Sequence, residues 1–316
     1  MIQTASVSPG GSGKPQHVLL SGGTGFIGQH LARRLLDQGH QVTVWTRRQA
    51  LADAPERSGL RHVTALDAVP TDAPVDVVVN LAGARILGWP WTAARRQVLM
   101  DSRLGPTRQL VDWMARAATR PRLLISGSAI GYYGVQPLGN DSVLSEECPP
   151  RPVFMSTLCQ AWEQAAAAAT RHGVAVACLR FGLVLGRGGA LPMLLLPVRL
   201  GLGGRLGSGG QWMSWVHIED VLGAMAHVAQ QPALPAFGAW NVTAPEQLRQ
   251  RDFSRVAASV LRRPCVVPTP GWPVRLALGE QSDLLLQGQR VAPARLLATG
   301  YAFRFPALAG ALADLA

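Results

Sequence analysis

Three glycines separated by two residues each, Gly22, Gly25 and Gly28, follow the short apolar run 18–20. Because glycine has no Cβ atom, it permits a tight turn and lets backbone N–H groups approach a bound group closely. Residues 26–36 then carry apolar side chains at helical spacing, and the N-terminus of a helix has partial positive charge. A glycine-rich turn between a buried strand and a helix binds the pyrophosphate of a dinucleotide. The sequence therefore predicts a dinucleotide site at residues 22–28.

The strand-like segment 41–48 ends about 20 residues after these glycines, where NAD-binding folds place a carboxylate on the ribose 2′-hydroxyl. This chain has Thr46, Arg47 and Arg48 there instead. No carboxylate repels a 2′-phosphate at this place, and a guanidinium binds a phosphate through two hydrogen bonds. We therefore expect NADP, as NADPH, to be preferred over NAD.

Two further strand-like runs complete the predicted cofactor site. The run 75–83 is rich in β-branched residues and ends in small ones, as expected where a cofactor passes the carboxyl edge of a parallel sheet. The next run begins at residue 122. The predicted cofactor-binding residues are Gly22, Thr24, Gly25, Phe26, Ile27, Gly28, Thr46, Arg47, Arg48, Leu81, Ala82, Gly83 and Ser126.

Three hydroxyl groups in the loop after that run are candidates for chemistry on a substrate. They belong to Ser128, Tyr132 and Tyr133. A phenol exchanges a proton with a reacting oxygen, and a serine hydroxyl orients a carbonyl or hydroxyl group. We predict that Tyr133 or Tyr132 transfers the proton and that Ser128 orients the substrate.

The elements that must position these residues alternate between strand-like and helical patterns. This alternation predicts an α/β fold with a Rossmann-type, doubly wound parallel sheet. Residues 1–16 are rich in Ser, Gly and Pro, and we expect a disordered tail. Strands are predicted at 18–20, 41–48, 61–67, 75–83, 122–126, 174–186 and 239–244, and helices at 26–36, 92–101, 107–118, 154–171, 221–230 and 252–261.

Length and composition bound the class of protein. The chain has 316 residues, 48% of them hydrophobic, and can bury a large core. No apolar run is long enough to cross a membrane, and residues 1–16 lack an apolar segment of signal-peptide length, so we expect a cytoplasmic protein without a membrane partner. The four cysteines show neither a C-x-x-C pair nor metal-ligand spacing with histidine, so reduced thiols and no metal site are expected.

The net charge of +11 is carried almost entirely by arginine, since Lys14 is the only lysine among 30 basic residues. The arginines are scattered rather than gathered in a run, so we expect no nucleic-acid partner. A basic surface favours the recruitment of small anions such as a phosphorylated cofactor or substrate.

Several motifs together resemble a known family. Thr-Gly-Phe-Ile-Gly28, Asn-Leu-Ala-Gly83 and Leu-Arg-Phe-Gly-Leu-Val-Leu-Gly186 resemble the extended short-chain dehydrogenase/reductases, the group of the sugar-nucleotide epimerases and dehydratases. The segments ending at Arg103, Gly134, Glu163, Trp215 and Arg290 are similar to an atypical subfamily labelled NAD(P)-binding epimerase family protein. The resemblance covers about residues 17–312.

The resemblance implies a Rossmann domain over 17–186, with a return segment near 211–244. It also implies a smaller substrate lobe over 187–316, which includes an appended C-terminal segment over 264–316. A homodimer through a helix pair of the Rossmann domain is left open. Some relatives are named as cell-division inhibitors, which implies a regulatory alternative.

Most members of that superfamily use a Tyr-x-x-x-Lys pair, in which the lysine lowers the pKa of the tyrosine. If Glu163 aligns with the glutamate that usually follows the lysine, Cys159 stands at the lysine position and Met155 at the tyrosine position. The single lysine, Lys14, precedes the first strand, so no such pair is available. A buried tyrosine without a nearby ammonium group keeps a pKa of about 10 or higher, which makes it a poor base near neutrality.

Several residues have two readings that the sequence leaves open. Glu163 either faces the cofactor or forms an ion pair, and Arg180 either binds a substrate phosphate or pairs with a carboxylate. His217 caps a helix or acts in catalysis, and Cys159 is a core residue or a nucleophile. The glycine-rich stretch 201–210 clamps an anion or is a mobile loop. Two loop tryptophans, Trp89 and Trp91, stack on a ligand ring or pack on the scaffold.

The leading hypothesis is an NADP-dependent oxidoreductase or epimerase-like enzyme that acts on a small metabolite, with an anionic one favoured by the basic charge. The alternative is a non-catalytic NADP-binding protein that regulates a protein partner, since the glycine turn is intact while the Tyr-Lys pair is missing.

Overall fold

The computed structural model describes residues 14–53, 58–69, 74–88 and 90–316. Most of the predicted tail, residues 1–13, and Trp89 lie outside these ranges. Gln16 is described, and its backbone N–H donates to Nδ1 of His40 at 3.0 Å. Within the described residues, no helix has the length and apolarity needed to cross a membrane.

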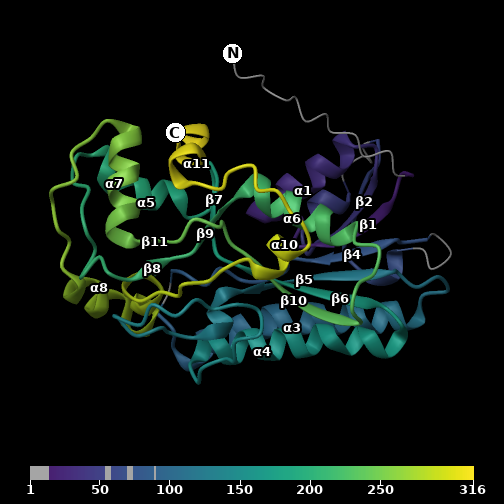
Figure 1. Ribbon diagram of the computed structural model, residues 1–316. Coiled ribbons are helices and arrows are strands. Elements are labelled where there is room, and N and C mark those ends of the chain that lie inside the picture. Colours follow the sequence, from purple (N-terminus) through teal and green to yellow (C-terminus); the bar gives the residue numbers. More distant parts are fainter. Residues whose placement is uncertain (1–13, 54–57, 70–73, 89) are drawn as a thin grey trace, which may run out of the picture.

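A seven-stranded sheet forms the centre of the molecule, and all its strand pairs are parallel (Figure 1). The strand order is β10-β6-β5-β4-β1-β2-β3. This order reverses direction between β1 and β4, which is where a doubly wound sheet binds its ligands. The strands are β1 (His17–Ser21), β2 (Gln41–Trp45), β3 (Leu60–Val63), β4 (Val77–Asn80), β5 (Leu123–Ala129), β6 (Ala175–Phe181) and β10 (Phe237–Val242).

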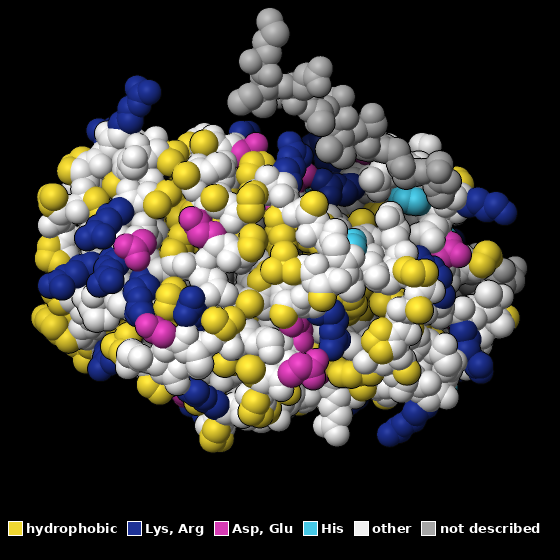
Figure 2. Space-filling view, in the orientation of Figure 1, with side chains coloured by type: hydrophobic (Ala, Val, Ile, Leu, Met, Phe, Trp, Pro, Cys, Tyr) yellow, Lys and Arg dark blue, Asp and Glu magenta, His cyan; other side chains and the backbone are white. Residues whose placement is uncertain are grey.

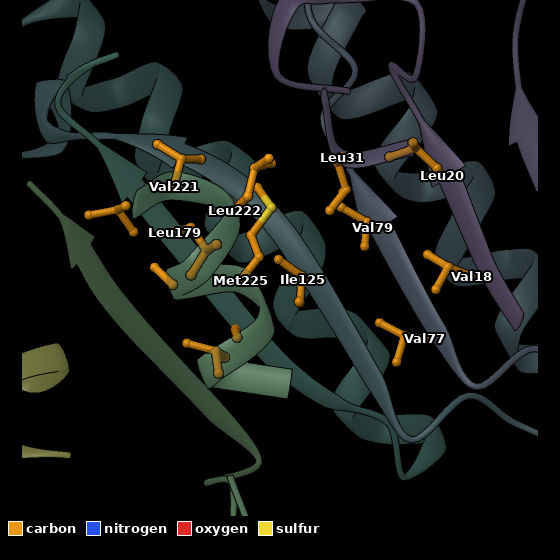
Figure 3. Close-up of a cluster of buried hydrophobic side chains, with 14 of the residues drawn as sticks. Val18, Leu20, Leu31, Val77, Val79, Ile125, Leu179, Val221, Leu222 and Met225 are labelled. Carbon is orange, nitrogen blue, oxygen red and sulfur yellow. The ribbon is translucent and has the colours of Figure 1, made fainter. Parts of the chain in front are cut away.

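Helices cover both faces of this sheet, so it forms the middle of three layers. Helices α1 (Phe26–Asp37) and α6 (Ile218–Ala229) lie on one face, and α3 (Ala93–Arg116) and α4 (Phe154–Ala167) lie on the other (Figure 1). Apolar side chains of α1 and α6, such as Leu31 and Met225, meet those of the strands in one buried cluster (Figure 3). The Rossmann-type α/β fold predicted from the alternation of elements is confirmed.

A second body of helices packs at the carboxyl side of the sheet around its own apolar cluster, which includes Leu195, Trp215, Phe253 and Leu312. Two small two-stranded sheets belong to this part, β7-β9 and β8-β11. Its elements are α5 (Leu191–Arg199), α7 (Gln250–Leu261), α8 (Gly271–Leu278), α9 (Asp283–Leu286), α11 (Leu308–Leu315), β7 (Leu183–Leu185), β8 (Trp212–Met213), β9 (Trp215–His217) and β11 (Leu248–Arg249). Helix α10 (Ala294–Ala298) packs instead against β10, and its Leu296 joins the apolar cluster of the large sheet.

The chain leaves the large sheet at Gly182, where a single strand over 174–186 was predicted. The N–H of Gly182 still donates to Val242 of the large sheet, but that of Leu183 donates to Ser214 at 2.8 Å. A Cβ atom at Gly182 would lie 2.6 Å from the Ser214 carbonyl oxygen. The single strand was therefore wrong, because glycine lets the chain switch sheets at this close approach.

Two helices were predicted around Pro106, and the structure has one helix, α3. Proline removes a helical N–H and favours a break. Here Leu99 and Leu110, on either side of Pro106, are both fully buried, and the Thr107 hydroxyl donates to the carbonyl of Arg103 at 2.6 Å. Packing on both sides of the proline outweighs its cost, so the predicted break was wrong.

Candidate cofactor and active site

The glycine turn is pressed against the end of a neighbouring strand. Gly22 has φ +74°, and a Cβ atom there would lie 2.5 Å from the backbone of Leu81. At Gly28 a Cβ atom would lie 2.3 Å from the carbonyl oxygen of Gly22. Both positions exclude any side chain unless backbone moves, so the turn keeps its backbone exposed to a ligand rather than to side chains.

The first turn of α1 has no internal acceptor for its N–H groups. Gly25 is the N-cap residue and offers no side chain, and the first turn contains no acidic residue. The N–H of Gly25 is used within the turn, where it donates to Gly22. The N–H groups that follow in a helix lack intrahelical partners and favour an anion. The residues present therefore fit a dinucleotide pyrophosphate at this turn.

Thr46, Arg47 and Arg48 lie at the same edge of the sheet, because Ser21 at the end of β1 pairs with Trp45 at the end of β2. Thr46 is buried, and its hydroxyl accepts the N–H of Arg48 at 3.1 Å. Arg47 and Arg48 are exposed, and neither forms an ion pair with a carboxylate of the described chain. Two free guanidiniums are thus available beside the glycine turn.

The segment after β4 passes next to the glycine turn and over a buried arginine. The Leu81 N–H donates to Ser21 at 3.0 Å, and a Cβ atom at the exposed Gly83 would lie 3.0 Å from the Arg103 guanidinium carbon. That guanidinium donates to the carbonyls of Leu99 and Ala84, and burial lowers its pKa. Nothing in the sequence pattern singled out Arg103 as part of this edge, although a charged residue at a buried helix position is a usable signal.

Ser126 lies deeper than the edge. Its side chain is fully buried, and its hydroxyl donates to the carbonyl of Gly127 at 3.3 Å. Ser128, two residues later, lies at the carboxyl edge of the sheet, since β5 extends to Ala129.

Ser128 is part of a buried ionic network. Its hydroxyl donates to Oε1 of Glu163 at 2.7 Å. The Arg180 guanidinium donates to both oxygens of the same carboxylate, each at 2.8 Å. This answers two questions that the sequence left open, because Glu163 and Arg180 form an ion pair with each other. Since the Ser128 proton is directed at Glu163, its buried oxygen can act toward a neighbour only as an acceptor, and the buried Cys159 thiol is one such neighbour.

Tyr133 is held in the same network. Its hydroxyl donates to Oδ1 of Asn241 at 2.7 Å and accepts a hydrogen bond from Arg180 at 3.0 Å. Burial raises the pKa of Tyr133 to about 12, despite the opposing effect of the Arg180 charge. The Glu146 carboxylate in turn accepts the N–H of Asn241 at 3.0 Å. A phenol whose hydroxyl already donates one hydrogen bond and accepts another is suited to stabilising the structure rather than to exchanging a proton with a ligand.

Tyr132 differs from its neighbour. It is half-buried, and its ring lies under the Arg180 guanidinium at 3.4 Å from carbon to ring centre. Among the described residues, no hydrogen bond engages its hydroxyl. The structure thus separates the two tyrosines that the sequence treated as equivalent, and leaves Tyr132 as the phenol with a free hydroxyl.

Cys159 is a core residue, as its fully buried side chain shows. Burial, with a smaller effect of nearby Glu163, raises its pKa to about 12. Because the thiolate is the reactive form, we expect iodoacetamide at mildly alkaline pH to label the half-buried Cys148 and Cys265 and to spare Cys159 and Cys178. Mass spectrometry of native and urea-unfolded protein checks this. Labelling of native Cys159 as fast as Cys148 would contradict it.

Contacts also decide two of the remaining readings, those of His217 and Trp91. His217 is the N-cap of α6, with Nδ1 accepting the Glu219 N–H at 3.1 Å, so it is a capping residue. Trp91 packs edge-on against Phe154. The glycine-rich stretch 201–210 runs beside residues 264–269, with the Val267 N–H donating to Gly203 at 3.0 Å.

Comparison with known proteins agrees with this geometry. Residues 18–243 match the model of the NAD dependent epimerase/dehydratase family, and residues 269–315 match a domain of unknown function, DUF1731. The chain is 33% identical to Epimerase family protein YfhF of Bacillus subtilis, over 95% of this chain and 97% of that protein. It is 37% identical to Epimerase family protein SDR39U1 of Bos taurus, over 94% and 99%.

A crystal structure of human epimerase family protein SDR39U1 with NADPH superimposes with a TM-score of 0.82 and 33% identity, covering 95% of this chain and 99% of that one. A structure of MoeE5 with UDP-glucuronic acid and NAD, at 22% identity and a TM-score of 0.72, covers 94% of this chain and 96% of that one and shares the fold. The chain belongs to the NAD dependent epimerase/dehydratase family, in the group of the epimerase family proteins that carry the DUF1731 domain.

Proposed function

We propose that this protein is an NADP-dependent oxidoreductase or epimerase-like enzyme that acts on a small, anionic metabolite. The observation that carries the proposal is the carboxyl edge of three adjacent strands. There the glycine turn after β1, the small residues after β4 and the hydroxyls of Ser128 and Tyr132 after β5 lie in one row. A dinucleotide supplies or accepts a hydride when bound at such an edge.

The side chains assign two roles toward a substrate oxygen. Tyr132 exchanges the proton with that oxygen, because its hydroxyl has no competing partner among the described residues. Ser128 accepts a hydrogen bond from the substrate, because Glu163 engages the serine proton. Lys14 cannot assist, since it precedes β1 at the amino end of the strands, opposite to this edge.

The preference for NADPH rests on Arg47 and Arg48. A 2′-phosphate beside the end of β2 would receive two guanidiniums that form no ion pair with the described residues, and the SDR39U1 structure that resembles this chain contains NADPH. Family members of the same fold bind NAD, so the choice depends on these side chains rather than on the fold.

Replacing Arg47 and Arg48 together by alanine is expected to weaken NADPH binding by about 30- to 100-fold, the effect of about 2 to 3 kcal/mol of charge-assisted hydrogen bonds. NADH binding is expected to change by less than about threefold, because NADH has no 2′-phosphate. Calorimetric titrations with both cofactors measure this. The double variant Arg108→Ala and Arg120→Ala, at two exposed positions elsewhere, removes the same charge as a control. An equal loss for both cofactors would refute the assignment.

Turnover tests the enzymatic proposal itself. NADPH oxidation is followed with a panel of aldehydes and ketones, and the interconversion of sugar nucleotides in the presence of NADP is followed by chromatography, using the wild type and Tyr132→Phe. Loss of the proton donor is expected to lower kcat about a hundredfold or more, with cofactor affinity unchanged. No turnover on any substrate, or full activity of Tyr132→Phe, would contradict the proposal.

One observation favours a second candidate, a non-catalytic NADP-binding protein that regulates a partner. The hydroxyls of Ser128 and Tyr133 both serve a buried network, as they would in a scaffold. Tight NADPH binding without turnover, together with a partner whose binding depends on NADPH, would support this candidate over the enzyme.

A further inference from the structure

Six large apolar side chains lie exposed on one part of the C-terminal body, which we call the apolar–basic surface. On α5 and just after it, Met193 is 76% exposed, and Leu196 and Leu200 are more than half exposed. Val266, Trp272 and Leu276 are 77%, 70% and 82% exposed. Side chains of this size are rarely so exposed together unless they meet another surface.

Hydrogen bonds join the two segments that carry these side chains. The Val267 N–H donates to Gly203, and the Thr269 N–H donates to Arg205 at 2.8 Å. The segment that follows α5 thus lies beside residues 264–269, which lead from α7 into α8. The buried side of α5, including Leu195, faces α7, and within the described residues its exposed apolar side has no packing partner.

The charges on these segments have one sign. Residues 187–210 and 262–278 contain no aspartate or glutamate. On the face shown in Figure 2, basic side chains gather at the left, where Figure 1 places α7. The arginines of the two segments are Arg187, Arg199, Arg205, Arg262, Arg263 and Arg275.

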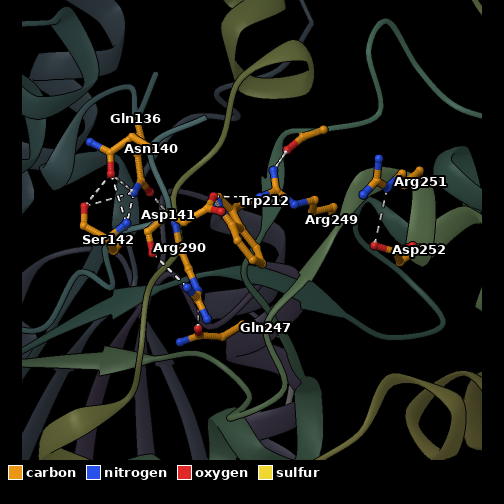
Figure 4. A network of polar contacts seen from close by, with 11 residues as sticks. Gln136, Asn140, Asp141, Ser142, Trp212, Gln247, Arg249, Arg251, Asp252 and Arg290 are labelled. Carbon is orange, nitrogen blue, oxygen red and sulfur yellow. Dashed lines mark hydrogen bonds and ion pairs between the residues drawn. The ribbon is translucent and has the colours of Figure 1, made fainter. Parts of the chain in front are cut away.

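A pocket of about 330 Å³ opens within this surface, and Arg205, Arg251 and Arg255 line it beside Val266. Gly209 lets two of these arginines approach, since a Cβ atom there would lie 2.9 Å from that of Arg205 and 3.0 Å from that of Arg251. Asp252 is the carboxylate that neighbours them, at 3.4 Å from Arg255 and 3.9 Å from Arg251 (Figure 4). Three guanidiniums against one carboxylate leave net positive charge in the pocket.

We propose that the apolar–basic surface binds the surface of an anionic phospholipid membrane, with a lipid phosphate seated between Arg205, Arg251 and Arg255 and with Trp272 and Leu276 inserted among the headgroups. Exposed Trp and aliphatic side chains bounded by arginine are typical of proteins that lie on a membrane interface. Each basic residue near an anionic membrane adds to the electrostatic attraction.

The arrangement fits a membrane better than a protein partner. The apolar side chains project from two short helices and from residues 264–269 beside them, and the pocket next to them is lined by three arginines as well as by small and apolar residues such as Val266 and Pro268. A peptide partner needs an apolar groove, whereas a lipid surface needs only projecting apolar groups and positive charge. The sequence predicted no membrane partner because no run is long enough to span, and that criterion does not address side chains exposed on a folded surface.

Vesicle flotation of the full chain tests the proposal. Vesicles are made of phosphatidylcholine alone or of equal parts phosphatidylcholine and phosphatidylglycerol. The wild type is expected to float with the anionic vesicles, to do so less as salt is added, and to remain behind with phosphatidylcholine alone. Trp272→Ala with Leu276→Ala, and Arg251→Ala with Arg255→Ala, are each expected to lower partitioning roughly tenfold or more.

Matched control variants distinguish binding through the apolar–basic surface from nonspecific hydrophobic adsorption and from an effect of net charge. Val98→Ala with Leu138→Ala removes exposed apolar groups elsewhere, and Arg108→Ala with Arg120→Ala removes equal charge; both are expected to float as the wild type does. Retained NADPH binding and thermal unfolding confirm that every variant is folded.

Three results would overturn the proposal. One is that the wild type does not float with anionic vesicles. Another is that Arg108→Ala with Arg120→Ala lowers partitioning as much as Arg251→Ala with Arg255→Ala does, which would mean that net charge alone acts. The third is that the protein binds no vesicles but binds inorganic phosphate or self-associates in sedimentation equilibrium. In that case Trp272→Ala with Leu276→Ala, or Arg251→Ala with Arg255→Ala, would remove the phosphate binding or the self-association. That result would assign the surface to a free anion or to a second copy of the chain.

Discussion

Gly28→Val is expected to lower the affinity for NADPH about a hundredfold or more, equivalent to at least about 2.7 kcal/mol. The new side chain would begin 2.3 Å from the Gly22 carbonyl oxygen and 2.7 Å from the Gly23 Cα atom. Both contacts are with backbone, which cannot move aside as a flexible side chain can. The turn must therefore open, and the first N–H groups of α1 lose their alignment toward the phosphates. Calorimetric titration with NADPH measures the loss.

The matched control is Gly105→Ala, where a new Cβ atom meets nothing within 4 Å. It is expected to leave NADPH affinity unchanged within about twofold. Thermal unfolding shows whether Gly28→Val remains folded. A folded Gly28→Val protein with wild-type affinity would mean that the cofactor does not lie on this turn.

Glu163→Ala is expected to lower the free energy of unfolding by about 3 to 5 kcal/mol. The carboxylate is buried, accepts two hydrogen bonds from Arg180 and one from Ser128, and neutralises a guanidinium that is itself buried. Its removal leaves that charge without a partner in a region of low polarity. Urea unfolding followed by tryptophan fluorescence measures the change.

Two further variants make the test specific. Asp67→Asn removes a carboxylate whose ion pair with Arg116 is mostly exposed, and it is expected to cost less than about 1 kcal/mol. Glu163→Leu combined with Arg180→Met removes both charges and is expected to be more stable than Glu163→Ala. A loss for Glu163→Ala as small as that for Asp67→Asn would show that the pair does not stabilise the fold.

The central sheet could be predicted because each of its elements is marked locally. The runs at β1, β4 and β5 are apolar and end at glycine or small residues, and α1 has clear helical periodicity. Errors arose where long-range packing overrode a local signal. Pro106 does not end α3, since Leu99 and Leu110 are buried on either side of it, and Gly182 sends the chain into a second sheet because Ser214 lies against it.

The glycine turn could be predicted from the sequence because its three glycines lie close together in the chain. The network around Ser128 could not be found in this way. It joins side chains from β5, α4, β6 and β10 through Arg180, which bonds both Glu163 and Tyr133, so these groups meet only after the sheet has formed. A signal was nonetheless present, since Arg180 is the one charged residue in the buried strand β6 and therefore requires a partner.

The cofactor site and the Ser128 network lie at the same edge of the sheet but differ in how their polar groups are paired. The glycine turn and Arg47–Arg48 form no side-chain ion pair within the described residues, whereas Ser128 and Tyr133 are tied to Glu163, Arg180 and Asn241. This network fixes the end of β5, and it holds Tyr132 beside the residues proposed to bind the cofactor. The account thus predicts a preformed site that changes little when the cofactor binds.

The measurement that tests this account most directly is a calorimetric titration of cofactor-free protein with NADPH and, in parallel, with NADH. The account predicts NADPH binding at one site per chain, with an affinity at least about tenfold higher than that of NADH. Equal affinities would contradict the role assigned to Arg47 and Arg48. Binding of neither cofactor would contradict the central claim that the edge formed by β1, β2 and β4 is a dinucleotide site.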